Sequence, residues 1–202
     1  IPLTEDFHLD IAHLHESVFS QPRKLRTDAW IGSFLCHYPI PIFDQGHWFD
    51  FVQAAVSAHF FLPSNVLQRA KPFAERARSA WLNLQISTGG FTSQSIRQYL
   101  SSMKDAANAI SCLTSVPLTD RRFLIDLPLR AQDLGMPGLA SGFVDLILPE
   151  EPIEPNWEAW LESWRKDFTR LQGLTETPLI YGEGRMPYYE KAIQGLKDTQ
   201  QD

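Results

Sequence analysis

The chain has 202 residues, of which 44% are hydrophobic and 21% are charged, and its formal net charge is −6. The apolar content excludes a wholly disordered chain. The negative charge argues against a general nucleic-acid binder, which needs a basic surface. No apolar run reaches the roughly 18 residues of a membrane span, so we expect no membrane partner. Two cysteines, Cys36 and Cys112, are too few for a disulfide scaffold and favour a reducing, cytoplasmic location.

The N-terminal segment is predicted to contain one short strand or strand pair. Apolar and polar residues alternate between Thr4 and Glu16, as they do on a strand with one buried face. A lone strand cannot satisfy its own backbone groups, so we expect it to be the edge or remnant of a sheet. The chain opens with Ile1 and has neither an initiator Met nor a signal-peptide pattern, which agrees with a piece of a longer protein.

The apolar pattern changes to a helical period after residue 46, which predicts a mainly α protein. We interpret residues 1–46 as a strand and extended segment, and residues 47–202 as a bundle of five to seven helices. Pro128 is expected to kink or end the helix that contains it. The predicted helices cover residues 47–61, 64–86, 92–113, 119–127, 139–148, 157–171 and 186–197.

Three tryptophans share one stripe of a predicted helix. Trp157, Trp160 and Trp164 recur at helical spacing. Large rings are more often buried than arranged as a ligand cage, so we expect these side chains to lie in a core or an interface.

The N-terminal histidines and carboxylates raise the question of a metal site. His13 and His15 lie on one side of an extended segment, and His8 precedes them. This set could bind zinc or iron, although no third ligand follows at a diagnostic spacing. Asp6 and Asp10 would be about 13 Å apart on a strand, too far to share one ion. The alternative is that these are the polar positions of a half-exposed strand.

Nucleophilic catalysis has no support in the sequence. The G-x-S-x-G pattern is absent, and Cys36 and Cys112 both lie in apolar segments. We therefore expect both cysteines to be small buried side chains rather than nucleophiles.

The middle of the chain is basic although the whole chain is acidic. Arg69, Arg76 and Lys104 could converge on an anion such as a nucleotide phosphate. Asn108 follows Lys104 by one helical turn, at the edge of an apolar stripe, where polar groups often line a groove. The alternative is a solvated helix face.

Three segments of the chain resemble the helical C-terminal region of the nucleotidyltransferase superfamily, of the DNA-polymerase-β-like type. They are residues 38–49, 106–143 and 185–196. The specific signature of that superfamily is Gly-Ser followed by Asp-x-Asp, and the chain lacks it, because prolines follow Gly32-Ser33. The resemblance therefore implies a chain that does not transfer a nucleotide by itself.

The resemblance also implies a ligand set. The superfamily uses magnesium to help an acceptor hydroxyl attack the α-phosphate of a nucleoside triphosphate. Asp10 would match the third catalytic carboxylate of the family. Arg69, Arg76, Lys104 and Asn108 are expected to contact the nucleotide or a small-molecule acceptor, on the basis of their helical positions alone.

Two other functions stay open at this point. One is a non-enzymatic helical module that binds a protein or another ligand, as a homodimer or with a partner chain. The other is a metalloprotein that uses His8, His13 and His15.

Overall fold

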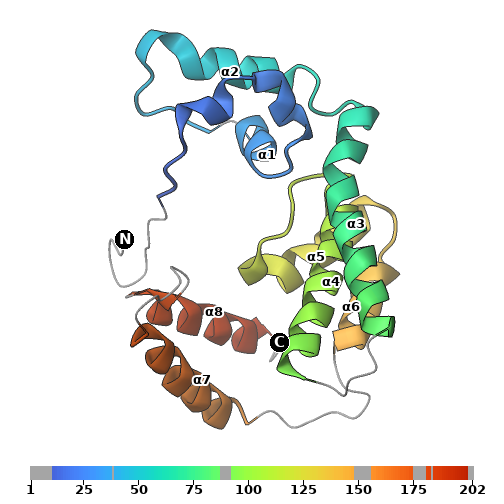
Figure 1. Cartoon of the computed structure of the whole chain (residues 1–202), viewed down its shortest axis with the longest axis vertical. Coiled ribbons are helices and arrows are strands. Elements are labelled where there is room, and N and C mark those ends of the chain that lie inside the picture. The colour runs from blue at the N-terminus through green and yellow to red at the C-terminus, as the bar shows by residue number, and fades with distance from the viewer. Residues whose placement is uncertain are drawn as a thin grey trace. The chain divides into compact units, whose positions relative to one another are not determined.

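A computed structural model describes residues 11–37, 39–86, 92–147, 156–174, 181–182 and 184–199 (Figure 1). All regular structure in these ranges is helical, which confirms the prediction of a mainly α protein for the described residues. The predicted strand falls mostly on residues 1–10, so that part of the prediction lies outside the described residues, as do His8 and Asp10. No helix in these ranges is long and apolar enough to cross a bilayer.

The first of two compact units is Leu14–Glu150. It holds a series of short helices followed by longer ones. In chain order these are η1 (Glu16–Phe19), η2 (Pro22–Thr27), α1 (Ile31–Cys36), η3 (Gln45–His47), α2 (Trp48–Ser57), α3 (Pro63–Ile86), α4 (Ser93–Ser111), η4 (Asp120–Arg122), α5 (Phe123–Asp133) and α6 (Gly138–Ile147).

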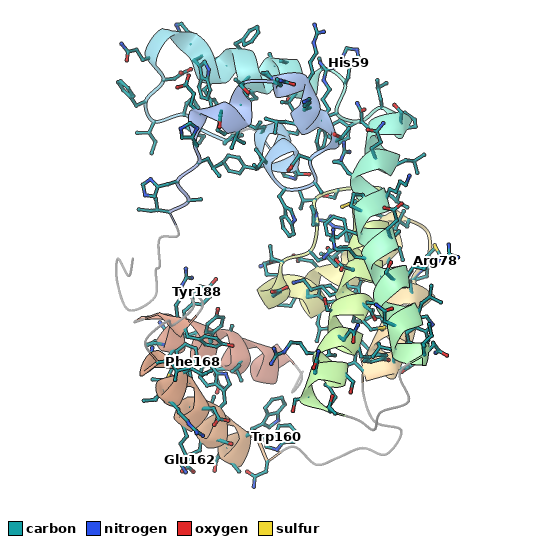
Figure 2. The ribbon with its side chains drawn as sticks, viewed as in Figure 1. His59, Arg78, Trp160, Glu162, Phe168 and Tyr188 are labelled. Atoms are coloured by element: carbon teal, nitrogen blue, oxygen red, sulfur yellow. The ribbon has the colours of Figure 1, made fainter. Side chains whose placement is uncertain are left out.

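The second unit contains α7 (Trp157–Gln172) and α8 (Arg185–Thr199). Phe168 of α7 is buried, and its ring lies 6.0 Å from that of Tyr189 on α8. Trp164 also contacts Tyr189, at 6.4 Å between ring centroids. Trp160, in contrast, is 52% exposed near the start of α7 (Figure 2). The tryptophan stripe is therefore only partly buried.

The first unit begins with a small apolar cluster built from η2, α1 and α2. Leu25, Leu35, Val52, Val56 and Phe60 form its buried centre. The sequence pattern does not predict η2 or α1, because a helix of six residues is too short to show a periodic stripe.

Helices α3 and α4 lie side by side and carry the second half of this unit (Figure 1). Thr92 caps α4, because its side chain accepts a hydrogen bond from the Ser95 amide while Ser95 bonds back to the Thr92 amide. A second apolar cluster joins α4 to α5 and α6 around Leu118, Leu127 and Phe143. The helices after residue 46 thus correspond to the predicted ones, as α2 to α8, except that α5 starts later and ends later than the predicted range 119–127.

Two helices continue through a proline. α5 extends over Pro128 to Asp133, so this proline does not end its helix, and α3 likewise contains Pro72. Both prolines face solvent, where water can bond the carbonyl group that loses its intrahelical partner. In α5, Leu127 and Ala131 are fully buried on either side of Pro128, and this packing offsets the cost of the missing hydrogen bond.

Gly32 allows α1 to approach η2 closely. A Cβ atom on Gly32 would overlap the Leu25 carbonyl oxygen and lie 3.0 Å from Cε2 of Phe60.

We predict that Gly32→Ala lowers the free energy of unfolding by about 2 kcal/mol or more, because the backbone at Leu25 or Gly32 must shift to make room for the added Cβ atom. Gly142→Ala is the matched control, since a Cβ there meets nothing within 4 Å in α6. This control is expected to raise the free energy of unfolding by about 0.5 kcal/mol. Urea denaturation measures the free energy of unfolding of both variants. Equal midpoints for Gly32→Ala and Gly142→Ala would contradict the packing argument.

Candidate functional site

Arg69 is buried, with 3% of its surface exposed. One terminal nitrogen donates hydrogen bonds to the carbonyl oxygens of Arg26, at 2.6 Å, and Phe60, at 2.7 Å. The guanidinium also lies over the Phe60 ring, 3.6 Å from its centroid. Burial lowers the pKa of Arg69 below its usual value. In this geometry Arg69 joins α3 to η2 and to the turn after α2.

Arg76 lies on α3 and Lys104 on α4, and each is paired with a carboxylate. Nε and a terminal nitrogen of Arg76 donate to the two carboxylate oxygens of Asp105, at 3.1 and 2.9 Å. These bonds raise the pKa of Arg76 above its usual value. Lys104 forms an ion pair with Asp120. Both cations are partly exposed, so a phosphate could reach them only in competition with these carboxylates.

Asn108 is fully buried, in contrast to its neighbour Lys104. Its side-chain oxygen accepts a hydrogen bond of 2.6 Å from the amide of Leu118. Asn108 therefore ties the segment that leads into α5 to α4. Arg69 and Asn108 are thus bonded to backbone groups inside the fold, whereas Arg76 and Lys104 are bonded to carboxylates and partly exposed.

The two cysteines are buried, as the sequence predicts. Burial raises the pKa of both thiols, that of Cys112 to about 11.

The histidines of the predicted metal set do not form a ligand group in the part of the chain that is described. His13 and His15 are exposed, and His15 Nδ1 bonds the Ser17 hydroxyl at 2.8 Å. A different group, which sequence reasoning missed, consists of Asp44, His47 and Asp50, with one ligand atom from each within 4.8 Å of the others. Only the i, i+3, i+6 spacing around a turn could have indicated it.

The geometry of this second group also has an explanation in helix capping. Asp44 accepts hydrogen bonds from the Phe49 amide at the start of α2, at 3.0 and 3.1 Å. His47 Nδ1 lies 3.1 Å from a carboxylate oxygen of Asp50. His47 has a φ of 56°, so the turn aims its imidazole along the first turn of α2.

The most exposed apolar residues of the first unit lie within one short stretch of sequence. Ile40, Ile42 and Phe43 are 88%, 100% and 86% exposed. Here we call Pro39–Phe43 the apolar segment. It connects α1 to η3 and has no regular structure. The sequence shows its prolines, but it does not show that the packing of α1 and α2 leaves these side chains outside the core.

Comparisons of the chain with protein families, curated proteins and solved structures find no match.

Arg69 supplies a test of its structural role. Arg69→Leu leaves the carbonyl groups of Arg26 and Phe60 without their donor, which we expect to lower the free energy of unfolding by about 3 kcal/mol. Arg78→Leu, an exposed position on the same helix, is the control and should change it by less than about 0.5 kcal/mol. Urea denaturation measures both variants. Equal losses of stability would show that the buried hydrogen bonds contribute nothing specific.

Proposed function

We propose that the chain is a helical, non-enzymatic interaction module that binds a protein partner through the apolar segment. The observation that supports this proposal is the exposure of Ile40, Ile42 and Phe43, each at 86% or more. Single exposed apolar residues are common on proteins, but contiguous ones mark contact surfaces. Transfer of such side chains from water into an interface is favourable by about 25 cal/mol per Å² of apolar area.

The apolar segment is also restricted before it binds. Pro39 and Pro41 fix their own φ angles, and Pro41 confines Ile40 to extended conformations. At the other end, the hydrogen bonds between Asp44 and the Phe49 amide attach the segment to α2. A restricted segment loses less conformational entropy on binding, which favours association.

A second copy of the chain is the partner that can be tested directly. We expect sedimentation equilibrium to show concentration-dependent association of the wild-type chain. The double variant that combines Ile42→Ser with Phe43→Ser should lose this association. Ile86→Ser is the matched control, since Ile86 is 76% exposed on α3. The Ile86→Ser variant should associate as the wild-type chain does. Loss of association in both variants would indicate non-specific hydrophobic contact. A wild-type chain that stays monomeric at every concentration would contradict the self-association form of the proposal.

The second candidate function is the nucleotide-binding helical part of a nucleotidyltransferase-like protein. Arg76 and Lys104 favour it, because both cations are only partly covered and they lie on the neighbouring helices α3 and α4. A triphosphate with magnesium would exchange the carboxylate partners of these cations for phosphate oxygens. Asp10, outside the described residues, would hold the metal together with the missing Asp-x-Asp pair.

Thermal shift with ATP, CTP and GTP in the presence of magnesium tests this second candidate. A nucleotide at 100 times its Kd stabilises the folded chain by about 2.7 kcal/mol, which raises the Tm. We expect Arg76→Gln with Lys104→Gln to abolish that shift, whereas Lys71→Gln, which breaks an exposed ion pair on α3, should keep it. The absence of any shift in the wild-type chain would contradict nucleotide binding by this chain alone.

A further inference from the structure

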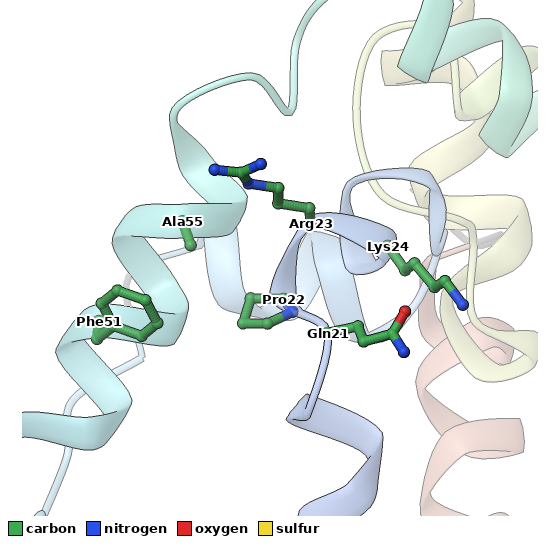
Figure 3. Close-up of a pocket in the computed structure, with 6 residues that line it drawn as sticks. All are labelled: Gln21, Pro22, Arg23, Lys24, Phe51 and Ala55. Carbon is green, nitrogen blue, oxygen red and sulfur yellow. The ribbon is translucent and has the colours of Figure 1, made fainter.

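We propose that the hollow between η2 and α2 binds a small organic anion, one that joins a single anionic group to a flat apolar ring. The hollow has a volume of about 310 Å³, at the lower end of the range for small-molecule sites. Its lining residues are Gln21, Pro22, Arg23, Lys24, Phe51 and Ala55 (Figure 3). None of them is acidic, and two are cationic.

The walls of this hollow are fixed by the fold rather than by a ligand. Leu25 of η2 is buried in the same cluster as Val52 and Val56 of α2. Nε of Arg26 donates a hydrogen bond of 2.9 Å to the carbonyl oxygen of Ala55. These contacts hold η2 against α2, so the hollow is formed before any ligand arrives.

The charge at the hollow is not neutralised within the described part of the chain. Arg23 and Lys24 form no ion pair there, whereas Arg76, Lys104 and Arg122 each pair with an aspartate. The side chain of Arg23 extends from η2 over Ala55, on the α2 side, while Lys24 points away from Phe51 (Figure 3). Arg23 is therefore the cation placed to meet an anion that lies against α2.

The apolar half of the hollow is a flat surface. Phe51 is 68% exposed, and Pro22 is half-buried beside it. An aromatic ring gains area burial and ring contacts on such a surface. A planar guanidinium binds a carboxylate or a phosphate through two parallel hydrogen bonds. A ligand with both features uses Arg23 and Phe51 together, whereas an inorganic anion or a neutral ring uses only one of them.

This site is independent of the apolar segment proposed for protein binding. The two surfaces share no residue, and the double variant Ile42→Ser with Phe43→Ser leaves every lining residue of the hollow unchanged. The experiments can therefore contradict one of the two proposals, ligand binding at the hollow or protein binding at the apolar segment, without contradicting the other.

Titration followed by amide chemical shifts in NMR spectra tests the site, with phenyl phosphate, benzoate, inorganic phosphate and phenol as probes. We expect phenyl phosphate or benzoate to shift the amides of Gln21, Arg23, Lys24, Phe51 and Ala55 saturably, with an affinity about tenfold above that for inorganic phosphate or phenol. The tighter of the two organic anions identifies the anionic group. No saturable shift at these amides, or equal affinity for all probes, would overturn the proposal.

Variants distinguish this site from general attraction to positive charge. We expect Arg23→Gln and Phe51→Ala each to weaken binding of the organic anion by about tenfold, and Lys24→Gln by less. The control is Arg78→Gln, which removes another exposed cation, on α3 (Figure 2), and should bind as the wild-type chain does. All four positions are at the surface or half-buried, and circular dichroism checks that each variant folds. If Arg78→Gln and Arg23→Gln weaken binding of the organic anion equally, net charge alone explains the loss of affinity and the proposed site is refuted.

Discussion

A buried guanidinium holds the first unit together. Arg69 donates hydrogen bonds to the carbonyl groups of Arg26 and Phe60, and the Arg26 side chain in turn donates to the carbonyl of Ala55. The two arginines thus connect α3, η2 and α2 in series. Burial of a charge is unfavourable unless hydrogen bonds replace those of water, and the two carbonyl groups supply such bonds to one terminal nitrogen of Arg69. Both faces of the η2–α2 hollow depend on this series of bonds.

Three cations of the basic middle, Arg69, Arg76 and Lys104, already have oxygen partners in the structure. A cation that is already bonded to protein oxygens cannot bind a phosphate without giving up those bonds. Arg69 is bonded to carbonyl oxygens, and Arg76 and Lys104 are bonded to aspartates. Arg23, in contrast, forms no ion pair in the described part of the chain, and it lies beside an apolar hollow.

The sequence predicts the long helices well and the short ones poorly. The start of α4 and its Thr92 cap are local patterns, and the structure contains both. The buried residues of α4, however, are Ser102, Ala107, Asn108 and Ser111, while Ile96 and Leu100 of the apolar stripe are 50% and 45% exposed. The helices η2 and α1 are held by contacts between distant residues, such as Gly32 with Leu25 and Phe60, which no local pattern shows. Prediction of the candidate site from the sequence is limited in the same way, because it also depends on contacts between distant residues. Sequence position suggested that Arg69 faces a ligand, but only the tertiary contacts show which partners each arginine has.

The position of Phe51 shows how one helix serves both the core and a surface. On α2, Val52 and Val56 point into the apolar cluster, whereas Phe51 and Ala55 are displaced by one residue and face the hollow. A change at Phe51 therefore alters the hollow without removing a core contact, while a change at Val52 removes one. Since the core residues of α2 also hold η2, the fold fixes the distance between the Phe51 ring and Arg23. Ligand recognition at the hollow would thus follow from packing that the chain needs for its own stability.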